Sequence, residues 1–350
     1  MFQLCTKELR IYTTIQLFKK HHNIMTMNFP KTEHFKGERF FNPEPPRYPH
    51  TKRRGGLLRL LRARYMQDES VWARWPQWIE NHPYPLPDTK TPSISWIGHS
   101  SFLVCLGGVN LLTDPVFSQR CSPVKFAGPK RVRAPGMTIE SLPRIDLILL
   151  SHNHYDHMDI ASLRLIKRRF PEAQLITSLG NADFLARKGL HRAVELDWWQ
   201  NVTINQTQIT ATPARHFAAR TLWDRNKTLW AGFMIQHQGK MLYFAGDTGY
   251  TKYFEEIHQR FGAPDLAMLP IGAYQPREMM ASVHMDPAEA VQAFLCLQPR
   301  RAVGMHFGTF QLTGEAIDEP LEKLAQSLAE QNIPTERFFT LDVGQTASLW

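Results

Sequence analysis

The sequence predicts an α/β fold in which two β-sheets pack against each other and helices cover their outer faces. Three observations lead to this prediction. Hydrophobic residues make up 43% of the 350 residues, which is enough for a large core. From about residue 91 the chain holds two blocks of short strands, each followed by helices. Several of these strands end in His or Asp, the usual place for a site built on a rigid sheet.

The first 90 residues differ from the rest of the chain in charge. They hold 16 Lys/Arg against 8 Asp/Glu, whereas residues 91–350 hold 25 against 24. We therefore expect a basic N-terminal arm with short helices (1–90) and one main domain (91–350). Because the main domain is neutral, we expect no general nucleic-acid-binding surface. Met1, Met25 and Met27 are all candidate translation starts.

Residues 55–67, GGLLRLLRARYMQ, have helical spacing, with Leu residues and Tyr65 on one face and Arg59 and Arg62 opposite. One interpretation is a helix packed on the domain. The other is a helix at a membrane surface, with its arginines near lipid phosphates. No signal peptide or apolar run of about eighteen residues is present, and the four cysteines are scattered. We expect a cytoplasmic protein, with peripheral membrane contact through this basic segment as the alternative.

The first block of the main domain opens with three short strands within residues 93–115, with a turn at Gly107-Gly108. A continuous apolar run predicts a buried strand over 144–152. The remaining expected elements of this block are, in order, a helix over 159–170, a strand over 173–178, a helix over 181–189 and a strand over 193–199.

The second block begins with strongly alternating segments at 202–216 and 230–247, the latter with a turn at Gly239. Asp286 precedes an apolar periodic segment, where an aspartate is a favoured N-cap, and so predicts the start of a helix. The remaining expected elements are, in order, a buried strand over 265–272, that helix over 286–297, a strand over 301–310 and a helix over 319–331.

A cluster of polar side chains follows the buried strand at 144–152. The stretch LILLSHNHYDHMD places His152, His154, Asp156 and His157 within six positions. Burying three imidazoles and a carboxylate costs desolvation, which a bound metal ion would offset. A metal site is therefore the first hypothesis for this segment.

Other strands end in residues of the same kind, namely Asp114, His216, Asp247 and His306. Imidazole and carboxylate ligands without thiolates favour zinc, with iron or manganese left open. Seven candidate ligands are too many for one tetrahedral ion and suit two ions about 3.5–4 Å apart. These seven are His152, His154, Asp156, His157, His216, Asp247 and His306. We therefore expect two Zn²⁺ ions per chain.

The segment SHNHYDHMD resembles the H-x-H-x-D-H signature of the metallo-β-lactamase superfamily. Further segments resemble the N-acylphosphatidylethanolamine-hydrolysing phospholipase D branch of that superfamily. The resemblance covers roughly residues 93–345, whereas the first 88 residues match little beyond FNPEP. The segments that carry it are WIGHSSFLV, LLTDPVFSQRCSPVKFAGPKRVR, LDWW, RTLWDRNKTLW, FAGDTGY, LPIGAYQPR, HMDPAEAV and MHFGTF.

The resemblance implies a four-layer αββα sandwich, a hydrolase domain over 91–350, and specific roles for the polar residues. It places His152, His154 and His216 on one zinc and Asp156, His157 and His306 on the other. Asp247 would bridge the two ions, and Asp114 would orient a ligand histidine. Tyr155 and His284 would lie near the substrate phosphate. The implied catalytic residues are Asp156, Asp247, His284 and Asp114.

The implied activity is that of a zinc-dependent phosphodiesterase of the phospholipase D type. A metal-bridging hydroxide would attack phosphorus, release an N-acylethanolamine and leave phosphatidic acid. One alternative is a hydrolase of the same fold that acts on a lactone, a nucleotide or a soluble phosphodiester. Another is a metal-stabilised binding or regulatory protein without turnover. The expected partner is a phospholipid or phosphodiester substrate, and no nucleic acid.

Overall fold

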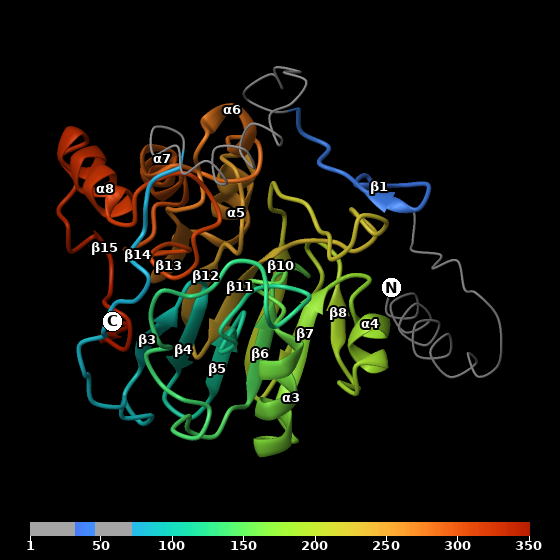
Figure 1. Cartoon of the computed structure of the whole chain (residues 1–350). Coiled ribbons are helices and arrows are strands. Elements are labelled where there is room, and N and C mark those ends of the chain that lie inside the picture. The colour runs from blue at the N-terminus through green and yellow to red at the C-terminus, as the bar shows by residue number, and fades with distance from the viewer. Residues whose placement is uncertain (1–31, 46–71) are drawn as a thin grey trace, which may run out of the picture.

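The computed structural model describes residues 32–45 and 72–350, and the helix expected over 55–67 lies outside them. Two seven-stranded sheets stack face to face with helices on both outer sides (Figure 1). This arrangement confirms the predicted αββα fold class. Within the described ranges, no helix combines the length and apolar character needed to cross a bilayer.

The first sheet is made mostly by the N-terminal half of the main domain. Strands β5 to β8 are parallel, whereas β16, β3 and β4 pair antiparallel at the other side. Its strand order is β16 (Thr346–Ser348), β3 (Ser93–Gly98), β4 (Ser101–Cys105), β5 (Asn110–Thr113), β6 (Leu147–Leu150), β7 (Gln174–Ser178) and β8 (Val194–Leu196). Helices α3 (Ile160–Arg169) and α4 (Ala182–Arg187) cover its outer face.

The second sheet carries its helices on the opposite side of the molecule. They are α5 (Tyr253–Phe261), α6 (Arg277–Met280), α7 (Pro287–Leu297) and α8 (Glu319–Glu330). The strand order is β15 (Phe338–Phe339), β14 (Arg301–Met305), β13 (Leu266–Pro270), β12 (Lys240–Phe244), β11 (Gly232–His237), β10 (Thr207–Thr212) and β9 (Asn201–Ile204). The predicted N-cap is confirmed, because the Asp286 carboxylate accepts a hydrogen bond from the Glu289 amide at 2.9 Å.

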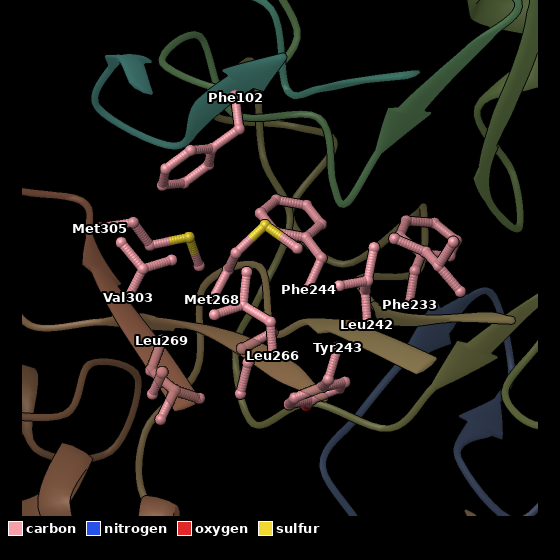
Figure 2. Close-up of a cluster of buried hydrophobic side chains, with 14 of the residues drawn as sticks. Phe102, Phe233, Leu242, Tyr243, Phe244, Leu266, Met268, Leu269, Val303 and Met305 are labelled. Carbon is pink, nitrogen blue, oxygen red and sulfur yellow. The ribbon is translucent and has the colours of Figure 1, made fainter. Parts of the chain in front are cut away.

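Side chains that alternate along the strands divide the core into layers. In the first sheet, Leu103 and Ile148 pack with α3 and α4, whereas Phe102 belongs to the core between the sheets. Figure 2 shows Phe102 pointing toward Phe244 and Met268 of the second sheet. Burial on both faces explains why these strands have nearly continuous apolar sequences.

The described parts of the predicted N-terminal arm pack on the main domain. The hairpin of β1 (Phe35–Lys36) and β2 (Arg39–Phe40) is joined to it by a hydrogen bond from the Phe40 amide to the Asn226 carbonyl, at 2.8 Å. The extended segment 72–90 is held at several points, including the Ala73 amide on the Gly314 carbonyl at 2.8 Å. Both described segments on the N-terminal side of residue 90 are therefore hydrogen-bonded to the main domain.

Candidate metal centre

The loop that carries the histidine cluster is anchored at both ends. It leaves the buried strand β6 and closes on itself through the amides of His157 and Met158, which donate to the His154 carbonyl. The Asp159 carboxylate then accepts from the Ala161 amide and begins α3. The loop therefore holds its side chains in fixed positions at the edge of the sheet.

A first group of imidazoles converges at this edge. The Nε2 atom of His152 lies 2.8 Å from Nδ1 of His154, and Nε2 of His216 lies 3.2 Å from the same Nδ1. The Oδ2 atom of Asp247 lies 3.9 Å from His152 Nε2 and 3.7 Å from His216 Nε2. The loops after β6, β10 and β12 thus bring four predicted ligands together.

A second group lies beside the first. The Oδ2 atom of Asp156 lies 3.4 Å from Nε2 of His157 and 3.5 Å from Nε2 of His306. Both Nε2 atoms are 3.1 Å from the Asp247 Oδ2 atom. One carboxylate oxygen of Asp247 therefore faces imidazoles of both groups. The structure brings together all seven residues predicted as ligands, and Asp247 lies between the two groups.

The donor atoms of the centre fit divalent cations. The Nε2 atoms of His157 and His306 and the Oδ1 atom of Asp247 are buried without a hydrogen-bond partner. Such an unpaired polar group is costly in a protein interior, and coordinated cations, together with a water that they bind, would satisfy all three. Nitrogen and carboxylate oxygen are the donors that zinc accepts in hydrolytic sites. The residues therefore fit the implied metal ions.

The electrostatics separates the imidazoles into two kinds. Burial opposes protonation of His157 and His306, but Asp247 and Asp156 outweigh it. The pKa of His157 lies well above its ordinary value, and the pKa of His306 rises to about 9. These carboxylates favour positive charge, which a divalent cation would supply. Burial instead lowers the pKa of His154 to about 4, so this imidazole is neutral, the form that binds metal.

The buried carboxylate of Asp114 contacts His157 directly and His152 through the Ser151 hydroxyl, on the ring side away from the centre. The Oδ2 atom of Asp114 lies 2.7 Å from His157 Nδ1 and accepts from the Ser151 hydroxyl at 2.6 Å. The same hydroxyl lies 2.9 Å from His152 Nδ1. Both imidazoles therefore direct Nε2 toward the centre. This contact supports the orienting role predicted for Asp114.

The two residues predicted to contact phosphate differ in position. The His284 ring lies 5.0 Å from the His216 ring and 5.2 Å from the His306 ring, and its Nδ1 atom is buried without a partner. Burial lowers its pKa to about 3, so the imidazole is neutral. Tyr155 instead stacks under the Arg220 guanidinium, 3.9 Å from the ring centre. His284 thus belongs to the centre, whereas Tyr155 lies at its margin.

Sequence analysis did not single out His99, which also belongs to the centre. Its Nε2 atom lies 3.1 Å from Asp156 Oδ2, and its ring lies 4.1 Å from the His306 ring. His99 sits in the turn after β3 with a left-handed φ of 56°, and its carbonyl accepts from the His306 amide. A histidine at a strand end was the available signal. Asn42 of the FNPEP segment was missed too; its amide donates to the His216 carbonyl at 2.9 Å.

Comparison with known proteins supplies the family. The sequence model described as "Beta-lactamase superfamily domain" matches residues 109–307, more than half of the chain. The chain belongs to this superfamily. It is 36% identical over 263 residues to N-acyl-phosphatidylethanolamine-hydrolyzing phospholipase D 1 of Caenorhabditis elegans, covering 72% of this chain and 74% of that protein. The predicted family resemblance is therefore confirmed.

Two further matches extend across nearly the whole length of the other protein. A UPF0173 metal-dependent hydrolase of Caldivirga maquilingensis is 30% identical over 258 residues, which is 73% of this chain and 97% of that protein. The structure of Igni18, a metallo hydrolase from Ignicoccus hospitalis, aligns with a TM-score of 0.55 at 24% identity, covering 73% and 97% of the two chains. This structural likeness shows the shared fold. Fold, family and the His/Asp cluster together are those of a metal-dependent hydrolase.

Proposed function

We propose that this chain is a binuclear zinc phosphodiesterase of the phospholipase D type, acting on N-acylphosphatidylethanolamine or a related phospholipid. The observation that carries the proposal is the position of Asp247, whose Oδ2 atom faces imidazoles of both ligand groups. A carboxylate shared in this way is suited to a pair of ions. The named activity of the C. elegans relative supports the choice of substrate.

The ligand sets follow from the two groups described above. His152, His154 and His216 would hold one zinc. Asp156, His157 and His306 would hold the other, with Asp247 contributing to both. When bound, the ions supply a Lewis acid for the phosphoryl oxygens and lower the pKa of a coordinated water.

The protein residues supply orientation and proton transfer. The Oδ1 atom of Asp247 is buried and unpartnered, so it can accept a hydrogen bond from an attacking water. The neutral His284 can donate from its ring to a phosphoryl oxygen that gains charge during attack. The surrounding buried strand ends keep bulk water from the other sides of the centre.

A second candidate is another hydrolase of this superfamily, with a lactone, a nucleotide or a soluble phosphodiester as substrate. It is favoured by the Caldivirga relative, which matches over 97% of its own length and is named only as a metal-dependent hydrolase. The two candidates share the metal centre and differ in the group that is attacked.

The test uses purified protein with three substrates: vesicles that contain N-acylphosphatidylethanolamine, a chromogenic phosphodiester and a chromogenic lactone. We expect N-acylethanolamine release that a chelator abolishes and zinc restores. In ¹⁸O-water the label should enter phosphatidic acid, because attack is at phosphorus. His306→Ala should be inactive, and His191→Ala, a change at an exposed histidine, should be active. Lactone hydrolysis without phosphodiester hydrolysis would establish the second candidate instead.

A further inference from the structure

A cavity of about 810 Å³ lies next to the metal centre. Its walls come from two loops, residues 118–125 and 220–224, from the N-terminal half of α3 and from Phe184 and Lys188 in and at the end of α4. Tyr155, between the predicted ligands His154 and Asp156, forms part of the wall. The seven predicted ligands themselves do not line the cavity. It is therefore a space beside the centre and not the centre itself.

Both loops expose large apolar side chains. Leu222 and Trp223, in the second loop, are 92% and 80% exposed, and Phe126, next to the first loop, is 83% exposed. Side chains of this size are mostly buried in folded proteins, and grouped exposure marks an interaction site. We call Phe126, Leu222 and Trp223 the loop-tip surface.

Hydrogen bonds hold the loop that carries Leu222 and Trp223 in place. The Arg220 guanidinium donates to the carbonyls of Asn153 and Met158 at 2.7 and 2.9 Å, which ties the loop to the histidine cluster. The Asp224 carboxylate accepts from the amides of Arg220 and Thr221 at 3.0 and 2.8 Å. The backbone therefore presents Leu222 and Trp223 outward in a defined turn.

The charges around the cavity are mostly positive. Four cationic residues line it besides Arg220, namely Arg120, Lys125, Arg164 and Lys188. The carboxylates on its wall are Asp159 and Asp224, and both accept hydrogen bonds from backbone amides. This surface therefore combines apolar tips with a surplus of cations. A second copy of the chain would bring the same cations against one another, which disfavours self-association through this surface.

We propose that the loop-tip surface docks on an anionic phospholipid bilayer, with Phe126, Leu222 and Trp223 at the headgroup boundary and the cavity cations facing lipid phosphates. Tryptophan and neighbouring Lys/Arg residues suit this boundary because the ring is amphipathic and phosphates attract the cations. The inference deepens the proposed lipid phosphodiesterase function, because docking here would bring headgroups beside Tyr155 and the metal centre. It assigns membrane contact to these loops as well as, or in place of, the basic N-terminal segment.

The test compares vesicle binding by full-length zinc-loaded protein and by two triple variants. Phe126→Ser/Leu222→Ser/Trp223→Ser removes the loop-tip surface. Trp78→Ser/Leu86→Ser/Leu295→Ser is the matched control, since it changes partly exposed apolar residues elsewhere. The vesicles are phosphatidylcholine with or without phosphatidylserine, and contain no N-acylated lipid. Binding is measured by co-sedimentation, and hydrolysis of a chromogenic phosphodiester is measured in parallel.

We expect wild-type protein to bind the phosphatidylserine vesicles, and the loop-tip variant to bind at least about tenfold more weakly. The control variant should bind like wild type, and all three should hydrolyse the soluble phosphodiester equally. Equal vesicle binding by the loop-tip variant and wild type, or no binding by either, would overturn the docking proposal. Self-association of wild type that the loop-tip variant loses would assign the surface to a second copy. Binding without phosphodiester hydrolysis would refute the proposed function alone.

Discussion

Replacing Asp114 with asparagine is expected to weaken metal binding through the tautomer of His157. The carboxylate accepts three hydrogen bonds, from the Ser151 amide at 2.8 Å, the Ser151 hydroxyl at 2.6 Å and His157 Nδ1 at 2.7 Å. An asparagine has one oxygen and one NH₂ group, so it cannot accept all three. If NH₂ faces His157, the imidazole must move its proton to Nε2, the atom that faces Asp247 and the predicted ion. If NH₂ faces the Ser151 amide, two donors oppose each other.

The expected loss follows from the role of such a partner. Removal of a carboxylate that orients a ligand histidine typically costs 10–100-fold in metal affinity or activity, or about 1.4–2.7 kcal/mol. Asparagine has the same shape as aspartate and fits the fully buried position of Asp114, so the fold should be kept. The assay is a zinc titration against a chromophoric chelator, with turnover on a phosphodiester and the melting temperature measured on the same samples. The affinity of one of the two ions should fall more than that of the other.

The matched control is Asp146→Asn. Asp146 is also buried, at 9% exposure, and precedes β6, whereas the metal loop follows this strand. It accepts from the Asn110 amide at 2.9 Å and contacts no histidine of the centre. The control should lose some thermal stability and keep its zinc affinity. Unchanged zinc affinity in Asp114→Asn would refute the orienting role, and complete loss of an ion would make Asp114 a direct ligand.

Four further outcomes are expected. Elemental analysis should find two ions per chain, with His306→Ala depleting one of them and Asp247→Ala weakening both; a single ion in wild type would contradict the shared site. His284→Ala should lower kcat by about 10²–10³ at unchanged zinc content and melting temperature, because a donor to the charged phosphoryl oxygen is lost. His99→Leu should weaken one ion roughly tenfold by releasing Asp156, and His99→Gln, whose amide can donate, should weaken it less; equal zinc affinity in both variants and wild type would refute this role. In metal-free protein, the proton on His306, with a pKa near 9, stabilises the fold fully below the unfolded value of about 6.5. This stabilisation is lost as the pH rises through 9, so the melting temperature should fall over that range more in wild type than in His306→Ala.

Local sequence pattern was sufficient for most of the secondary structure. The apolar run before His152 became the buried strand β6. The alternating segment at 202–216 became β9 and β10, and the one at 230–247 became the hairpin of β11 and β12. Helix α5 was missed, although its buried residues Tyr253, Phe254 and Ile257 have helical spacing. Strands β15 and β16 have two and three residues and exist through pairing with β14 and β3. Such pairing depends on tertiary context, which a local pattern does not contain.

The candidate site was predictable where its residues are close in sequence or follow an apolar strand. The H-x-H-x-D-H segment and the strand-end positions of Asp247 and His306 fall in this group. His99 also follows a strand, but a single histidine in the turn between two strands is more often structural, and its contact with Asp156, 57 positions further along the chain, is seen only in the folded structure. Asn42 was out of reach for the same reason, since 174 positions separate it from His216.

The division of the ligands between the two sheets has a mechanical consequence. Each group takes residues from the loop after β6 in the first sheet and from loops after strands of the second sheet. An ion in either group would act as a cross-link between the sheets, like a disulfide that closes a long loop of chain. His154 and His216 are 62 positions apart in the sequence, so a cross-link between them would close a long loop. Closing a loop of that length costs the unfolded chain much entropy. Removing such ions would therefore loosen the contact between the two sheets at the edge that carries the candidate metal centre.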